Sequence, residues 1–326
     1  MTASLDCNPM GWRNLLTIEE IVYICSQYSI GNLKHIYGNF QKATNTNILF
    51  ETDRGQYVAK ILHTEIERFK NIIEIIKILN QREVPVLLPL QNIYGEYLVN
   101  IGEQQIQVTK YIPSYKFSYE NRQVESSGAA LRKIHEALKD YIRISIPKAS
   151  IYPSQKVLKD GMERLSIWRH SLPKEYVLLI GRLHDEIIQK WEAGSKGLPQ
   201  TVIHGDWNER NQLYTVDGKV CCVLDFDFMQ RKERLFDIAY VLWNFLLHPK
   251  FNGFAKPFIQ GYGELVEKEK EILQIAIARI SLFFLCTASL SQDPIQEIHR
   301  QVAQQHPFIQ HILSKEGERQ MEELCK

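Results

Sequence analysis

Hydrophobic and polar positions near the start of the chain alternate in two short runs, residues 46–50 and 56–62. Alternation with a period of two is typical of strands that bury one face. The segment between them, 52–55, reads Thr-Asp-Arg-Gly and is a turn signal, so the two runs predict an antiparallel hairpin. Over residues 64–80 the apolar positions recur at intervals of three and four instead, which predicts a helix with one buried stripe.

A second hairpin is predicted further along the chain, where residues 212–216 and 219–224 both read as strands. Asp217-Gly218 separates them and favours a two-residue type I′ turn, because both central positions of that turn need positive φ. A hairpin of this kind returns the chain to its starting point. We therefore expect Asn211, just before the first strand, to lie beside Asp225, just after the second.

The segment 204–211, His-Gly-Asp-Trp-Asn-Glu-Arg-Asn, precedes this hairpin and reads as a polar loop. Asp206 could orient and deprotonate a hydroxyl, while the amide oxygen of Asn211 and the carboxylate of Asp225 are hard ligands that suit Mg²⁺. Each residue alone could be structural, as part of a turn or as a cap. Their order, with a loop, a hairpin and a strand end, favours catalysis. Asp227 shares a face with Asp225 if the strand continues, and we expect it behind the metal or facing the substrate.

Lys60 ends the run 58–60, Val-Ala-Lys, within an apolar strand. An ammonium group buried there without a partner is unfavourable, so a phosphate and a carboxylate are its expected companions. The alternative is an edge-strand lysine whose head group reaches water. The helix that follows offers Glu65, Glu67 and Glu74 as partners, and the spacing favours Glu74 without deciding among the three.

Composition and charge restrict the class of function. The chain has 326 residues, 44% hydrophobic and 24% charged, which is enough for more than one core. With a net charge of +1 and dispersed basic residues, neither nucleic acid nor an anionic membrane is an expected partner. Residues 1–6 lack the basic and apolar stretches of a secretory signal, so a cytoplasmic location is expected.

Two further patterns need an interpretation. The six cysteines include no CxxC pair and read as reduced, small apolar residues. The apolar run 272–290 is about long enough to cross a bilayer, but Gln274, Arg279 and Ser281 interrupt it. Because an arginine in mid-span is expensive in lipid, we predict a buried helix there. Another helix is expected over 237–247.

These motifs resemble a superfamily of small-molecule kinases related to protein kinases, which contains the aminoglycoside phosphotransferases, choline kinases and type II homoserine kinases. The resemblance covers roughly residues 30–290 and is carried by the segments 45–47, 58–60, 109–113, 131–135, 204–211, 224–227 and 235–239. It implies an α+β fold with two lobes. The N-lobe, residues 1–111, would hold an antiparallel sheet with one helix, and the C-lobe, residues 112–326, would be mainly helical with a catalytic hairpin.

The resemblance also implies roles for the residues around the second hairpin. Asp206 matches the catalytic base, Asn211 and Asp225 match the ligands of Mg²⁺, and Asp237 matches a residue that supports the catalytic loop from the start of the next helix. His204 is expected to orient the loop through hydrogen bonds.

On the nucleotide side, Lys60 matches the lysine that contacts the phosphates of ATP, with Glu74 as its expected partner. Asn45 belongs to the segment that follows the first loop. The stretch from Lys110 to Ile112 matches the hinge, whose backbone groups read the edge of the adenine. The first loop, 38–45, departs from the family in having a single glycine.

The sequence therefore predicts an ATP:alcohol O-phosphotransferase that uses Mg²⁺ and acts on a hydroxyl of a small molecule. An aminoglycoside or another amine-bearing alcohol is favoured. A homoserine or sugar kinase and a non-catalytic binding or coat protein of the same fold are the alternatives. The acceptor pocket is expected from helices between about 152 and 198 and after Asp237.

Overall fold

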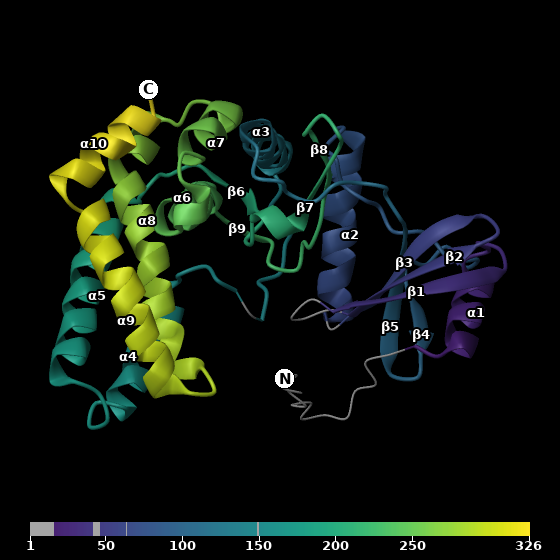
Figure 1. Ribbon diagram of the computed structural model, residues 1–326, viewed down its shortest axis with the longest axis horizontal. Helices are drawn as coiled ribbons and strands as arrows, with labels where there is room; N and C mark the ends of the chain where they lie inside the picture. The colour runs from purple at the N-terminus through teal and green to yellow at the C-terminus, as the bar shows by residue number, and fades with distance from the viewer. Residues whose placement is uncertain (1–15, 42–45, 63, 149) are drawn as a thin grey trace. The chain divides into compact units, whose positions relative to one another are not determined.

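The computed structural model describes residues 16–41, 46–62, 64–148 and 150–326 and divides into two compact units (Figure 1). The first unit contains Met1–Phe69 and Leu87–Pro113, and the second contains Lys70–Val86 and Ser114–Lys326. The division near Pro113 lies close to the boundary expected at residue 111. Residues 70–86, which were expected in the N-lobe, belong instead to the second unit.

A five-stranded antiparallel sheet forms the first unit, with the strand order β1-β2-β3-β5-β4. Its elements are α1 (Ile18–Gln27), β1 (Leu33–Gln41), β2 (Thr46–Thr52), β3 (Gly55–Leu62), β4 (Val99–Ile101) and β5 (Gln104–Lys110). The first predicted hairpin is confirmed as β2 and β3, with Thr52 paired to Gly55. The glycine has a φ of +137°, which explains why the turn needs it.

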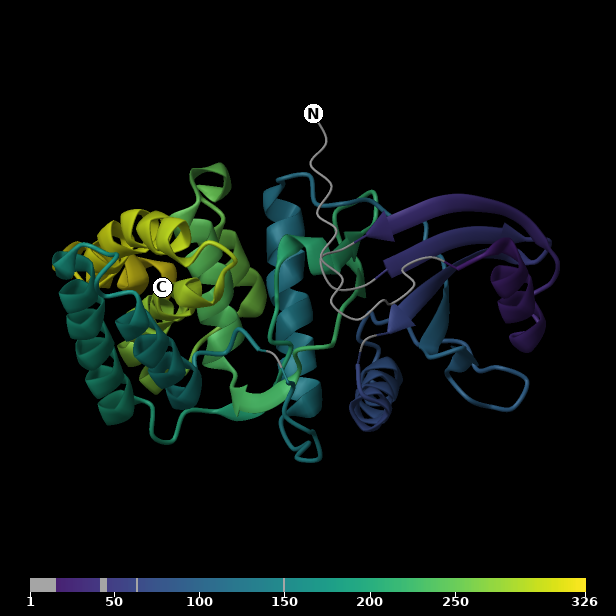
Figure 2. The same ribbon diagram turned by 90° about the horizontal axis from the view of Figure 1, so that it is seen from below.

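Helix α1 covers one face of this sheet (Figure 2). Thr17 starts the helix through a capping box, in which its hydroxyl accepts from the backbone N–H of Glu20 and the Glu20 carboxylate accepts from that of Thr17. Ile21 and Ile24 are buried against strand residues that include Ala59. Lys60 follows Ala59 and therefore points to the face that α1 does not cover.

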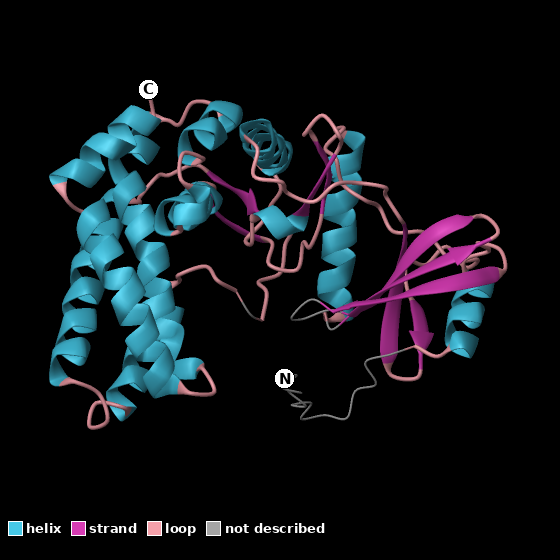
Figure 3. Cartoon of the chain, in the orientation of Figure 1, coloured by secondary structure: helices cyan, strands magenta, loops and turns pink. Residues whose placement is uncertain are grey.

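Helices dominate the second unit (Figure 3), as expected for the C-lobe. Helix α2 (Ile66–Gln81) begins in the first unit and continues into the second. The remaining elements are α3 (Asn121–Leu138), α4 (Gln155–Ile167), α5 (Lys174–Gly194), β6 (Gln200–Ile203), η1 (Glu209–Asn211), β7 (Gln212–Tyr214), β8 (Val220–Val223), β9 (Gln230–Glu233), α6 (Leu235–Leu247), η2 (Pro249–Phe251), α7 (Ala255–Tyr262), α8 (Glu267–Thr287), η3 (Ala288–Leu290), α9 (Pro294–Ile312) and α10 (Lys315–Leu324). Strand β6 pairs with β9, and β7 pairs with β8, both antiparallel.

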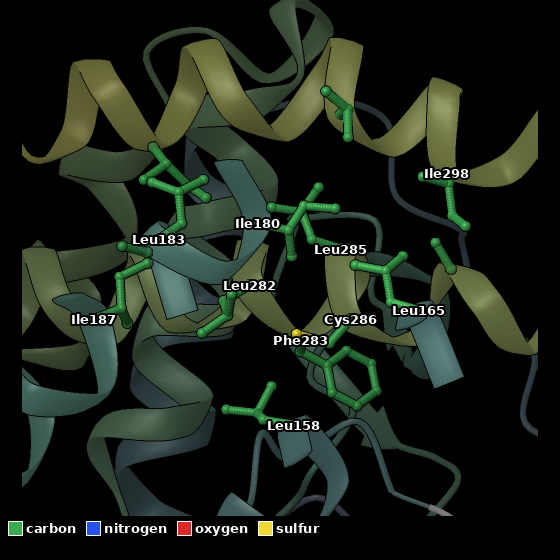
Figure 4. Close-up of a cluster of buried hydrophobic side chains, with 14 of the residues drawn as sticks. Leu158, Leu165, Ile180, Leu183, Ile187, Leu282, Phe283, Leu285, Cys286 and Ile298 are labelled. Carbon is green, nitrogen blue, oxygen red and sulfur yellow. The ribbon is translucent and has the colours of Figure 1, made fainter. Parts of the chain in front are cut away.

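Four helices, α4, α5, α8 and α9, enclose a hydrophobic core of this unit (Figure 4). Leu158, Ile180, Leu282 and Ile298 contribute to it, one from each helix. The stretch Glu267–Leu290 is long and apolar enough to cross a membrane, but 78% of its most apolar window is buried inside the protein. The run is a helix of the core, as its polar interruptions predicted.

Candidate active site

The catalytic loop follows β6 and is held in place by Asp237, in the first turn of α6. The Asp237 side chain is completely buried. Its Oδ2 accepts from the backbone N–H of His204 at 2.7 Å, and its Oδ1 accepts from that of Gly205 at 2.9 Å. This is the geometry expected of a residue that supports the loop from the start of the next helix.

A buried network fixes Asp237 in turn. Both oxygens of Asp237 accept from the backbone, so this carboxylate acts as an acceptor toward His135 as well, and His135 Nε2 donates to Asp237 Oδ2 at 3.0 Å. His135 Nδ1 then accepts from the Tyr262 hydroxyl at 3.0 Å. Burial raises the pKa of Tyr262, which keeps this hydroxyl a donor. Nearby, Arg234 donates two hydrogen bonds to the buried Glu269 carboxylate, at 2.8 and 2.7 Å. The loop thus rests on a satisfied polar interior.

Gly205 allows the loop to turn beneath Asp206. Its φ is +85°, a conformation that residues with a Cβ rarely adopt. A Cβ at this position would also lie 2.4 Å from the carbonyl oxygen of Phe228. Both observations explain the glycine between His204 and Asp206.

The carboxylate of Asp206 is held by three donors. Oδ2 accepts from Asn211 Nδ2 at 2.9 Å, and Oδ1 accepts from Asn208 Nδ2 at 2.8 Å and from the Tyr240 hydroxyl at 3.3 Å. Burial, followed by the nearby Asp206 charge, raises the pKa of Tyr240. The group predicted as the base is therefore a fixed carboxylate that only accepts hydrogen bonds.

His204 clamps the loop to the far end of the hairpin. The backbone N–H of Asp206 lies 3.3 Å from His204 Nδ1, so this nitrogen accepts, and His204 Nε2 donates to the carbonyl of Leu224 at 3.0 Å. Because both ring nitrogens are engaged, His204 has the geometry of an orienting residue. Its partner Leu224 directly precedes Asp225.

The predicted return of the hairpin is present in β7 and β8. The backbone N–H of Leu224 donates to the carbonyl of Asn211 at 2.8 Å, which places Asp225 directly after a residue bonded to Asn211. The predicted type I′ turn is wrong. Gly218 has a φ of +81°, Asp217 does not have positive φ, and the N–H of Gly218 donates to the carbonyl of Thr215 at 3.0 Å. The tip is a three-residue loop, in which only the glycine position is left-handed.

The strand does not continue to Asp225, which is a second correction. Strand β8 ends at Val223, and Asp225 has a φ of +67°, unusual for a residue other than glycine. Asp225 and Asp227 therefore do not share a strand face. A strained backbone at a candidate ligand is the kind of feature that gathers at functional sites.

The donor set fits Mg²⁺ in its chemistry. Since Asn211 Nδ2 donates to Asp206, the amide orientation is set and its Oδ1 is the atom suited to a metal. With Asp225 it offers one amide oxygen and one carboxylate. Among the described residues, no group of three or more His, Cys, Asp and Glu side chains converges on one point. A cation held here would complete its shell with phosphate oxygens and water, as Mg²⁺ commonly does.

The candidates on the nucleotide side lie mostly in the first unit. Lys60 is half-buried on β3, with Asn47 and Gln107 as its neighbours across the sheet. Lys110 ends β5, and Ile112 follows it. Asn45 lies outside the described residues.

The acidic partner of Lys60 stays a prediction. Glu74 belongs to the second unit, where its carboxylate accepts from the Tyr141 hydroxyl at 3.2 Å. Glu65 and Glu67 belong to the first unit. Which of the three glutamates pairs with Lys60 therefore stays undecided, as in the sequence-based prediction.

Two contacts of the Asp206 carboxylate were not predicted from the sequence. Tyr240 donates to the carboxylate from α6, and Asn208 donates from the loop itself. The available signal for Tyr240 was its helical spacing of three from Asp237, which places both on neighbouring positions of one helix. That spacing alone does not distinguish a tyrosine of the site from one of the core.

Known proteins resemble this chain in both sequence and fold. The profile of the phosphotransferase enzyme family (APH) matches residues 40–272. A homoserine kinase of Rhodopseudomonas palustris (strain BisA53) is 25% identical over 278 residues, which cover 82% of this chain and 83% of that protein.

Two solved kinases have the same fold. Amicoumacin kinase hAmiN in complex with AMP-PNP, Ca²⁺ and Ami superposes with a TM-score of 0.67 at 16% identity, covering 90% of this chain and 94% of that one. The microcompartment-associated aminopropanol kinase has a TM-score of 0.67 at 15% identity, covering 91% and 98%. The expected two-lobe kinase fold is thus confirmed. The chain belongs to the phosphotransferase enzyme family, and it is a kinase-type enzyme that acts on a small molecule.

Proposed function

We propose that the protein transfers the γ-phosphate of ATP to a hydroxyl of a small amine-bearing alcohol, and that homoserine is the first acceptor to test. The observation that carries the reaction is the Asp206 carboxylate, held by Asn208, Asn211 and Tyr240 at the mouth of the hairpin that ends in Asp225. The acceptor class is supported by the relatives, which include a homoserine kinase and an aminopropanol kinase.

Asp206 acts as the base in this proposal. Its carboxylate accepts the proton of the acceptor hydroxyl as the oxygen attacks the phosphoryl group. The amides of Asn208 and Asn211 each hold one carboxylate oxygen, which keeps the group aimed without a rearrangement during the reaction. Because phosphoryl transfer has a loose transition state, such positioning supplies much of the rate gain.

Asn211 and Asp225 would hold Mg²⁺, which when bound supplies charge neutralisation at the phosphates. Asp227, two positions further on, would face the substrate or the ligands of the metal. His204 and Asp237 hold the loop that carries these groups.

The first unit would bind the nucleotide. Lys60 would contact the phosphates, with one of the glutamates that the sequence offers as its partner. The backbone from Lys110 to Ile112 would read the adenine edge, and Asn45 is assigned to nucleotide binding from the sequence alone. This division of labour follows the family to which the chain belongs.

A coupled ADP-release screen across homoserine, amino alcohols, aminoglycosides and neutral sugars tests the function. We expect Mg²⁺-dependent turnover on an amine-bearing acceptor. Turnover confined to neutral sugars would contradict the acceptor class and leave the kinase activity standing. An ATP-dependent rise in melting temperature with no turnover on any acceptor would instead indicate a binding protein of the kinase fold.

A further inference from the structure

One side of α6 begins at the catalytic carboxylate and extends toward the C-terminal end of the helix. Tyr240 contacts Asp206, and Asn244 lies one turn further along the same side of the helix. One turn of helix advances by about 5–6 Å. This is the order of the span between the hydroxyl oxygen and the amine nitrogen of a short amino alcohol. Tyr240 also stacks on Trp243 with ring centroids 5.8 Å apart, which gives this side an aromatic floor.

Glu209 follows Asp206 by three positions in the catalytic loop and lines a cavity together with Asn244. Its side chain is only 16% exposed. Within the described parts of the chain, its one ion pair is a long contact of 3.9 Å with Arg210, whose side chain is 83% exposed. An exposed cation at that distance compensates a half-buried carboxylate poorly.

The negative charge of Glu209 affects the pKa of two residues on α6 and at its end, Tyr240 and His248. It adds to the rise in the pKa of Tyr240, after burial and Asp206. The pKa of His248, at the end of α6, is lowered by burial and by Lys250, and Glu209 opposes that shift. The carboxylate therefore lies within electrostatic reach of both ends of this side of the helix.

Glu209 and Asn244 also line a common cavity of about 10 Å³, between Trp207 and Phe245. A cavity of this size has room for about one water molecule, and a primary ammonium group is of similar size. Among the described residues, neither the Glu209 carboxylate nor the Asn244 amide makes a side-chain hydrogen bond to another residue. Both retain their capacity to bind a ligand.

We propose that Glu209 determines the acceptor specificity by binding the ammonium group of the acceptor, with Asn244 as a second polar contact. The hydroxyl of the same molecule then lies at Asp206, one helical turn away. The inference rests on the proposed function, because it names the residue that selects an amine-bearing alcohol. A carboxylate that is half-buried, weakly paired and three positions from the base in the same loop meets the requirement for charge-assisted binding of an amine.

The test compares matched acceptors on Glu209→Gln, which keeps the volume and removes the charge. The pairs are homoserine with 4-hydroxybutyrate, and 3-amino-1-propanol with 1-propanol. For the amine-bearing member, KM should rise ~10-fold or more, the scale of a charged hydrogen bond. For the member without the amine, KM should change little. Asn244→Ala should also raise KM for the amine-bearing member of each pair more than for the other member, but by a smaller factor than Glu209→Gln does.

Glu264→Gln is the matched control, because it makes the same chemical change at a side chain that is 85% exposed. Its KM values should equal those of the wild type. If a low melting temperature shows that Glu209→Gln folds poorly, Glu209→Asp replaces it in the comparison. A KM for the amine-bearing acceptor that lies between those of the wild type and Asn244→Ala then supports the assignment.

An unchanged KM, or an equal rise for both members of a pair, would overturn the role of Glu209 while wild-type turnover on amines still supports the proposed function. If the wild-type enzyme phosphorylates no amine-bearing acceptor, the proposed acceptor class fails, and the role of Glu209 fails with it.

Discussion

The carboxylate of Asp237 binds the catalytic loop through the backbone, with one oxygen on the N–H of His204 and the other on the N–H of Gly205. The loop position therefore depends on the residue at 237 as well as on the His204 side chain, which binds the carbonyl of Leu224. The contact also joins α6 to the end of β6, so the base and the Tyr240 hydroxyl share one support.

Asp237→Asn tests whether Asp237 supports the catalytic loop without taking part in the reaction itself. The amide keeps the shape but turns an N–H₂ group toward a backbone N–H, which leaves a buried donor unsatisfied at about 2–3 kcal/mol in the free energy of unfolding. Chemical denaturation measures the loss, and kcat should fall with KM for ATP little changed. Asp140→Asn, at an exposed position after α3, is the control. Equal stability of the two variants would contradict the supporting role.

Asp206→Asn tests the base. The amide cannot accept the hydroxyl proton, so kcat should fall by at least ~10², the scale of general-base catalysis. Folding and ATP binding should stay close to the wild type, as melting temperature with and without ATP will show. A purified variant with near wild-type turnover would rule out the assignment.

Asp225→Ala and Asp227→Ala together test the metal ligand. Asp225→Ala should lose Mg²⁺-dependent turnover by more than ~10²-fold, above the range seen for residues that only support a ligand. Asp227→Ala should lose less. A titration with Mg²⁺ for each variant gives the apparent affinity, and EDTA should abolish wild-type turnover. The reverse order of damage would move the ligand to Asp227.

Lys60→Met tests the nucleotide side. Loss of a charge aimed at the phosphates should lower kcat about 10²-fold, as removal of one stabilising donor does elsewhere. Lys34→Met makes the same change at an exposed position of β1 in the same sheet and should have wild-type kinetics. If both variants behave alike, Lys60 is a surface lysine of the strand.

Gly205→Ala should destabilise the protein through both an unfavourable φ and a steric clash, and the same substitution at Gly253 measures the effect of φ alone. At Gly253 the φ is +86° and nothing lies near the added Cβ, so Gly253→Ala should cost about 1–2 kcal/mol from φ alone. At Gly205 the φ is nearly equal, but the Cβ collides with Phe228, which should add about 1–3 kcal/mol. Urea denaturation compares them, and similar losses would mean that the loop can relax.

The sequence predicted much of the fold because its signals were local. The hairpin of β2 and β3, the stripe of α2 and the return of the second hairpin were each visible as periodicity with a turn between. Helix α1 was missed because ten residues carry little periodic signal before their burial against a sheet is known. The turn at Gly218 was misjudged since Asp-Gly suits two hairpin geometries, and only the strand register decides between them.

The arrangement of the candidate site was predictable where its residues are close in sequence, and less so where distant elements meet. Asp206, Asn211 and Asp225 lie within one loop and hairpin. Tyr240 joins Asp206 from a later helix, and only tertiary structure shows this contact. The left-handed backbone of Asp225 was equally hidden, because most aspartates have negative φ even though Asp adopts positive φ more often than most residues do.

The two halves of the site should form at different times when the chain folds. A short hairpin brings Asn211 and Asp225 together, and hairpins of this kind form in about 1–10 μs. The bond from His135 to Asp237 instead spans 102 residues, so it must await the docking of α3 and α6. In a refolding experiment, enzymatic activity should therefore return with the slow phase, well after the hairpin has closed.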